Sequence, residues 1–142
     1  MKSRTTEPPN GRTVLDAFRL DGRVAVVTGA SRGLGAAMAV ALAEAGADLV
    51  QTARTRADLE READGIRRLG HRVLAVPADV TVRADVERVA AETLGAFGRI
   101  DVLVNNAGMG SETPFLDLAD ADWDRVLETN LRAAYLCTHA VG

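Results

Sequence analysis

Short apolar runs rich in β-branched residues alternate with helical patterns along most of this chain. The runs have the length of single strands and cover residues 23–28, 48–53, 72–78 and 100–105. Continuous apolar runs are typical of strands buried on both faces of a parallel sheet, with helices making the crossovers between them. The sequence therefore predicts an α/β fold, namely the N-terminal part of a doubly wound parallel sheet.

The predicted helices lie between these runs and after the last one. Residues 33–45 carry the first helical pattern, and Thr55 with Asp58 resembles a capping box that starts the second. Residues 82–97 carry the clearest amphipathic stripe, and a last helical pattern begins at Asp120. Each predicted strand is thus followed by a predicted helix, as a sheet of βαβ units requires.

The composition is that of a single globular domain of 142 residues, 47% of them hydrophobic, with a net charge of −3. The basic residues are scattered and form no cluster of the kind that binds nucleic acid or a membrane surface. No apolar run approaches the ~18 residues of a membrane span. Residues 1–12 are polar and lack the apolar stretch of a secretion signal, so we expect a disordered lead-in. We expect residues 13–142 to form the folded domain of a cytoplasmic protein.

Several residues that could carry separate chemistry have simpler interpretations. Cys137 is the only cysteine and has mostly apolar neighbours, which favours packing in a core or interface over a reactive thiol. His71 and His139 lie far apart without other ligand types nearby, and we predict no metal site. Residues 120–124 begin like a calcium loop, but the sixth position is Arg125, where such loops need glycine.

A glycine-rich turn, TGASRGLG, lies between the first predicted strand and the first predicted helix. Glycines have no Cβ atom to block a tight turn or the approach of a pyrophosphate, and the helix start supplies free N–H groups. The spacing G-x-x-x-G-x-G differs from the common dinucleotide fingerprint, but the strand–turn–helix context favours phosphate binding. The predicted contacts from this turn are Gly29, Ser31, Arg32, Gly33, Leu34 and Gly35.

Polar residues follow the other strands as well. Arg54 follows the second strand, Asp79 the third, and the segment NNAG at residues 105–108 the fourth. These positions meet at the carboxyl edge of one sheet, which is where open α/β folds bind ligands. Taken alone, Asp79 is equally well explained as a carboxylate that caps the next helix before Thr81.

The motifs TGASRGLG, ADV, NNAG and ETN, in this order and spacing, resemble those of the short-chain dehydrogenase/reductase family. The resemblance runs from about Leu20 to the last residue. It implies a Rossmann-like dinucleotide-binding domain over residues 13–142, and hydride transfer between a nicotinamide cofactor and a carbonyl or secondary alcohol. It also implies a role for each matching residue: Asp79 and Val80 contact adenine, Asn106, Ala107 and Gly108 lie along the adenosine ribose, and Asn130 bends the last helix and holds a water of the proton relay.

The resemblance also bears on the choice of cofactor. Family members that use NAD usually have an acidic residue at the end of the second strand, where this chain has Ala53. Arg54 follows it and Arg32 lies in the glycine-rich turn, so both could donate charge-assisted hydrogen bonds to a 2′-phosphate. Either arginine alone is equally well explained as a solvated side chain. The missing acid and the two arginines together predict NADP(H), with NAD as the alternative.

The catalytic tyrosine of the family is followed four residues later by a lysine. Here Tyr135 is followed by His139, and Lys2 is the only lysine, so no such pair occurs in these 142 residues. We expect the catalytic serine, tyrosine and lysine to lie beyond Gly142, the domain to be truncated within the helix after the fourth strand, and this chain alone to be inactive.

Three functions follow from these patterns. The first is an enzyme that acts, as a homo-oligomer at full length, on a small carbonyl or alcohol substrate. The second is a dinucleotide-binding module without catalysis. The third is an interaction protein whose exposed fourth strand pairs with another chain.

Overall fold

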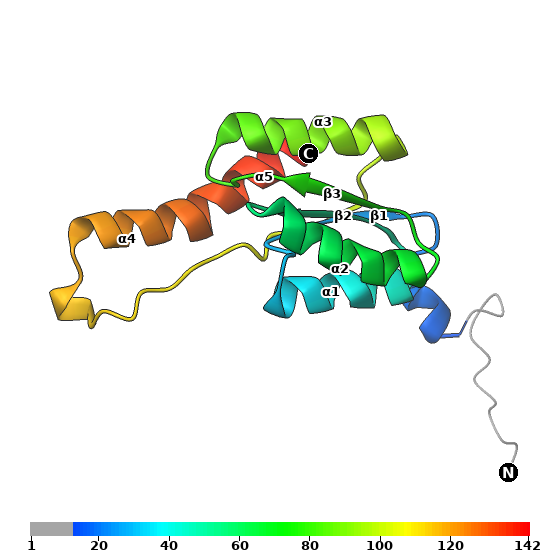
Figure 1. The fold of residues 1–142 in the computed structure, drawn as a ribbon, viewed down its shortest axis with the longest axis horizontal. Helices are drawn as coiled ribbons and strands as arrows, with labels where there is room; N and C mark the ends of the chain where they lie inside the picture. Colours follow the sequence, from blue (N-terminus) through cyan, green and yellow to red (C-terminus); the bar gives the residue numbers. More distant parts are fainter. Residues whose placement is uncertain (1–12) are drawn as a thin grey trace, which may run out of the picture.

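The computed structural model describes residues 13–142, so the lead-in predicted for residues 1–12 lies outside the described part. One parallel sheet forms the centre of the domain, with the strand order β3-β2-β1-β4 (Figure 1). Its strands are β1 (Val24–Thr28), β2 (Asp48–Ala53), β3 (Val73–Pro77) and β4 (Val102–Val104). All lie within the predicted runs, and the predicted doubly wound parallel fold is confirmed.

Helices cover both faces of the sheet (Figure 1). On one face lie α1 (Gly33–Glu44) and α2 (Arg56–Arg68), and on the other lie α3 (Arg83–Phe97) and α5 (Ala133–Val141). The first face packs residues such as Ala39, Ala43, Leu59, Ala63 and Ile66 against the sheet, and the second packs Val86, Val89, Leu136 and Cys137. β1 lies between β2 and β4 in the sheet, with one helix layer on each face, and is therefore buried along its whole length.

The predicted capping box at the start of α2 does not form. Thr55 is the N-cap residue, but its side chain makes no capping hydrogen bond. Asp58, which has a shorter side chain than the glutamate of a capping box, accepts a hydrogen bond from Arg61 at 2.9 Å instead. The predicted stripe of α3 is also only partly buried, because Val82 and Leu94 are 47% and 50% exposed.

The last helical pattern forms three consecutive segments. They are α4 (Asp120–Leu127), the π-helical turn η3 (Glu128–Arg132) and α5. In Figure 1, α4 projects beyond the edge of the sheet, and the chain reaches the packed core only in α5. Two short 3-10 helices, η1 (Leu15–Phe18) and η2 (Phe115–Asp117), lie outside the sheet. Within residues 13–142, no helix is long and apolar enough to cross a membrane.

Cys137 is packed in the core formed by α3 and α5, as its apolar neighbours predict. Its side chain is buried, and this burial raises the pKa of the Cys137 thiol. A buried thiol with a raised pKa is a poor nucleophile, because the thiolate is the reactive form.

Gln51 is an unexpected polar side chain in the middle of β2. It is 0% exposed, and neither polar atom of its side-chain amide has a hydrogen-bond partner among the described residues. Its neighbours on the adjacent strands are Val27 and Ala75, which offer no polar side-chain group. Burying an unpaired amide carries a free-energy cost, so Gln51 lowers the stability of the sheet.

We predict that Gln51→Met raises the free energy of unfolding by about 1–3 kcal/mol, because it removes the unpaired amide and keeps a side chain of similar size. Urea denaturation measures the change. Gln51→Glu is the matched control, and it should lower the stability because it places a carboxylate in the same buried position. A Met variant less stable than the unaltered chain would contradict this assignment.

Asp101 joins the starts of β1 and β4. Its carboxylate accepts hydrogen bonds from the backbone N–H of Val24 at 2.9 Å, from Arg23 at 2.8 Å and from Nε of Arg99 at 2.7 Å. Arg99 foremost, then the Val24 N–H and Arg23, hold the pKa of the Asp101 carboxyl well below its usual range. The ionised carboxylate therefore stabilises the folded chain.

This contribution should depend on pH in a defined direction. A carboxyl whose pKa is lower in the folded than in the unfolded chain stabilises fully above the unfolded value of about 4, and less as the pH falls below it. We predict that Asp101→Asn lowers the urea midpoint at pH 7 and that the difference shrinks toward pH 3. Asp124→Asn, at an exposed position, is the control. The same loss at both pH values would show that the charge of Asp101 is not responsible.

Candidate functional site

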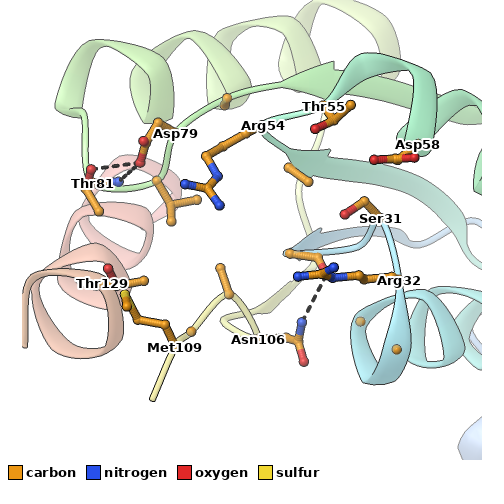
Figure 2. Close-up of a pocket in the computed structure, with 18 of the residues that line it drawn as sticks. Ser31, Arg32, Arg54, Thr55, Asp58, Asp79, Thr81, Asn106, Met109 and Thr129 are labelled. Carbon is orange, nitrogen blue, oxygen red and sulfur yellow. Dashed lines mark hydrogen bonds between the residues drawn. The ribbon is translucent and has the colours of Figure 1, made fainter. Parts of the chain in front are cut away.

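The carboxyl ends of the strands open into one pocket of about 860 Å³ (Figure 2). Every residue predicted to contact the cofactor lines this pocket. These residues are Gly29, Ser31, Arg32, Gly33, Leu34, Gly35, Arg54, Asp79, Val80, Asn106, Ala107 and Gly108. The fold thus gathers the separate sequence motifs at one edge of the sheet. Asn130, the predicted proton-relay residue, is not among the residues that line it.

The glycine-rich turn forms one wall of the pocket and is tightly packed on its inner side. Gly29 and Gly33 have positive φ angles of 66° and 58°, which favour glycine. A Cβ atom on Gly35 would lie 2.3 Å from the carbonyl oxygen of Gly29, so no larger residue fits there without a shift. A Cβ atom on Gly33 would meet nothing within 4 Å, which leaves space on the outer side of the turn.

The start of α1 faces the same space. Arg32 is its N-cap residue and makes no side-chain capping bond. The first turn of α1 therefore presents backbone N–H groups and the positive end of the helix dipole to the pocket. This arrangement fits an anion such as a pyrophosphate.

Asn106 and Thr28 fix the turn to the end of β4. The side-chain amide of Asn106 donates to the carbonyl oxygens of Thr28 at 2.9 Å and Gly29 at 3.3 Å. In return, the Thr28 hydroxyl accepts from the backbone N–H groups of Asn106 at 3.1 Å and Ala107 at 3.0 Å. The role of Thr28 was not predicted, although it is the first residue of the glycine-rich motif.

Arg54 and Arg32 approach the pocket from different walls (Figure 2). Arg54 extends from the end of β2, and Arg32 extends from the glycine-rich turn; both side chains belong to exposed residues. Ala53 lines the pocket beside them, so no acidic side chain occupies the end of β2. Asp58 in the first turn of α2 also lines the pocket, a position that the motifs did not indicate.

The side chain of Asp79 stabilises the loop that follows β3. Its Oδ1 atom accepts from the backbone N–H of Thr81 at 3.0 Å and from the Thr81 hydroxyl at 2.7 Å. Its own N–H donates to Asp85 at 2.8 Å, and this N–H together with Arg88 lowers the pKa of the Asp85 carboxyl. These bonds form a turn ahead of α3, whose N-cap residue is Val82 and which has no side-chain capping bond, so Asp79 does not cap that helix. Asp79 also lines the pocket.

Asn130 lies in η3, the π-helical turn between α4 and α5. Its Oδ1 accepts from the N–H of Met109 and its Nδ2 donates to the Met109 carbonyl, both at 2.8 Å. The side chain is thereby engaged on both polar atoms and holds the loop after NNAG. Met109 and Thr129 line the pocket beside Asn130; Thr129 belongs to the ETN motif, but neither residue was predicted to contact the cofactor.

The sequence model of the family described as short chain dehydrogenase matches residues 23–142. Galactitol 2-dehydrogenase of Rhizobium johnstonii is 44% identical over 126 residues, which cover 88% of this chain and 49% of that protein. The chain therefore belongs to the short-chain dehydrogenase family of oxidoreductases. It spans about half the length of the curated relatives that it matches.

Solved structures of the family share this fold. The crystal structure of a short-chain type dehydrogenase/reductase from Mycobacterium marinum matches with a TM-score of 0.88 and 37% identity, over 92% of this chain and 53% of that chain. A metagenomic short-chain oxidoreductase in complex with NADP matches with a TM-score of 0.79 and 42% identity, over 85% of this chain and 55% of that chain. At these identities the likeness supports family as well as fold.

We predict that Gly35→Ala destabilises the chain by about 1–3 kcal/mol, because the added methyl group must displace the Gly29 carbonyl or the Asn106 amide. Urea denaturation measures the loss. Gly95→Ala is the matched control, since this helical glycine of α3 has nothing within 4 Å of a Cβ position. The control should raise the stability by up to about 1 kcal/mol. Equal stability of the two variants would argue against the close packing at Gly35.

Proposed function

We propose that this chain is the cofactor-binding part of an NADP(H)-dependent short-chain dehydrogenase or reductase. The whole protein would transfer a hydride between the cofactor and a small carbonyl or secondary alcohol. The observation that best supports this proposal is the composition of the pocket. An open glycine-rich turn and two arginines line it, and the residue at the end of β2 is not acidic. The domain so defined is residues 13–142.

The pyrophosphate would bind at the glycine-rich turn. The first turn of α1 offers N–H groups, and the space beside Gly33 admits a group that a side chain would exclude. Ser31 and Leu34 line the same part of the pocket. When bound, the nicotinamide ring of the cofactor donates or accepts the hydride, and the residues of this chain hold and orient it.

The 2′-phosphate of the adenosine ribose would bind between Arg54 and Arg32. Both guanidinium groups are in reach of the pocket from different elements, and neither takes part in an ion pair within residues 13–142. Asp58 lines the pocket nearby, but Arg61 pairs with its carboxylate and offsets its charge. The NADP complex of the metagenomic relative supports this choice of cofactor, with NAD as the alternative.

The adenine would lie against the loop after β3. Asp79 Oδ1 is taken by Thr81, so Oδ2 is the oxygen that a ligand would meet, and Val80 supplies an apolar wall. Asn106, Ala107 and Gly108 would line the ribose side. Asn130 would act at the nicotinamide end through Met109, whose backbone it holds.

We place the catalytic serine, tyrosine and lysine outside these 142 residues, because the chain spans about half of its relatives and contains no Tyr-x-x-x-Lys. A dinucleotide-binding module without catalysis is the competing function, and the same missing pair favours it. Translation of the reading frame past Gly142 separates the two: a serine followed by Tyr-x-x-x-Lys supports the enzyme.

We also propose that the whole protein is a cytoplasmic homo-oligomer. Exposed Trp123, Leu127 and Leu131 on α4 and η3 offer apolar surface for association, with exposed fractions of 46%, 38% and 67%. The single buried thiol of Cys137 suits a reducing compartment.

We predict that Arg54→Ala weakens NADPH binding about ten- to a hundredfold, because a charge-assisted hydrogen bond to the 2′-phosphate is lost. NADH lacks that phosphate, so its affinity should hardly change. Isothermal titration calorimetry measures both affinities in the unaltered chain and the variant.

Arg56→Ala is the matched control for this experiment. Arg56 is the nearest arginine in the sequence, lies 3.8 Å from Glu60 in an ion pair on α2 and does not line the pocket. The control should bind both cofactors like the unaltered chain. Equal losses for NADPH and NADH in Arg54→Ala would mean that this arginine does not select the phosphate, and no NADPH binding by the unaltered chain would overturn the proposed function.

A further inference from the structure

The loop after β3, which carries Asp79 and Val80, is held by more than its own residues. On one side, Asp85 of α3 accepts the N–H of Asp79 at 2.8 Å, as described above. On the other side, Arg132 of η3 donates from Nη1 to the carbonyl oxygen of Thr81 at 3.1 Å. Thr81 and Arg132 are 51 positions apart in the chain. The contact therefore links the Asp79–Thr81 loop, against which the adenine would lie, to the η3 turn.

The same π-helical turn also holds the opposite wall. Asn130 grips both backbone polar groups of Met109, and Arg132, two positions later, reaches Thr81. Residues two positions apart project toward nearly opposite sides of a helix, so one turn can contact two walls. Thr81 and Met109 both line the pocket, and Figure 2 shows them above and below Thr129 of this turn.

Arg132 is set up for this contact by Glu128. Its Nη1 lies 3.1 Å from Oε1 of Glu128, four positions earlier in the same segment. The ion pair is exposed, so its own contribution to stability is small. The ion pair restricts the conformations of the long arginine side chain. Less conformational entropy is therefore lost when Arg132 forms its bond to Thr81.

We infer that Arg132 is a positioning residue of the dinucleotide site, which fixes the Asp79–Thr81 loop relative to the Met109 loop. The inference rests on the proposed function for its ligand, although the contact itself does not. Because Arg132 acts through the loop, its loss weakens binding of the cofactor by letting Asp79 and Val80 move. Neither the glycine-rich motif nor the NNAG and ETN motifs include this residue.

The test compares Arg132→Met, which keeps the length of the side chain without its donors, with Arg132→Lys, which keeps one donor group. Two readouts are needed. Amide hydrogen exchange followed by NMR reports the loop directly, through the N–H of Thr81, bonded to Asp79 Oδ1, and that of Val82, bonded to the Asp79 carbonyl. Calorimetric titration with NADP⁺ reports the affinity of the site.

For Arg132→Met we expect exchange at Thr81 and Val82 to be faster and the affinity for NADP⁺ to be weaker, each by about two- to tenfold, the size of one lost hydrogen bond. Amides of β1 should exchange as before, and Arg132→Lys should recover part of both effects. Arg83→Met is the control, because Arg83 pairs with Glu87 at 3.7 Å on the surface of α3 and does not line the pocket.

Each outcome has a distinct meaning. Unchanged exchange at Thr81 and Val82 in Arg132→Met overturns the inference, and so does faster exchange with unchanged affinity for NADP⁺. Equal effects in Arg83→Met would mean that loss of any arginine suffices, which also overturns it. If the unaltered chain does not bind NADP⁺, the proposed function fails and takes the positioning role with it, while faster exchange in the Met variant would still establish that Arg132 holds the loop.

Discussion

The contact between Thr28 and Asn106 is the interaction on which the pocket depends. It joins the carboxyl ends of β1 and β4 through one hydroxyl and one amide, and it places the carbonyl of Gly29 against α1. Because Gly35 packs against that same carbonyl, the position of the helix start follows from the position of Asn106. The glycine-rich turn is thus positioned by three elements, although its motif lies in a single stretch of sequence.

Patterns that depend on near neighbours could be predicted from the sequence. The period of apolar residues located the strands and most helix faces, and the position of each motif after a strand placed it at the pocket, since parallel strands share one carboxyl edge. Contacts that depend on how distant elements meet gave no such signal. The bond from Arg132 to Thr81 and the lack of a partner for Gln51 arise from helix and sheet packing, which no local spacing encodes. The capping box failed for a local reason, because Arg61 competes for the carboxylate of Asp58.

Charge is distributed unevenly between the structural and the pocket ends of the sheet. At the amino end, Asp101 gathers Arg23 and Arg99 and is neutralised by them. At the carboxyl end, Arg54 and Arg32 face the pocket, while the nearby acid Asp58 is paired with Arg61. The arginines at the amino end thus have an acidic partner, whereas Arg54 and Arg32 form no ion pair within residues 13–142.

β4 is short and only half-buried, yet it carries Asn106 at its end. An edge strand of this kind opens locally more often than the fully buried β1 beside it. In any molecule where β4 has come loose, Asn106 no longer supports the carbonyl of Gly29, and the glycine-rich turn loses this support. The affinity measured for a ligand is then the intrinsic affinity multiplied by the fraction of molecules in which β4 is docked. Whatever covers the free side of β4 would raise that fraction, so binding of a ligand at the glycine-rich turn would be coupled to ordering of the sheet edge.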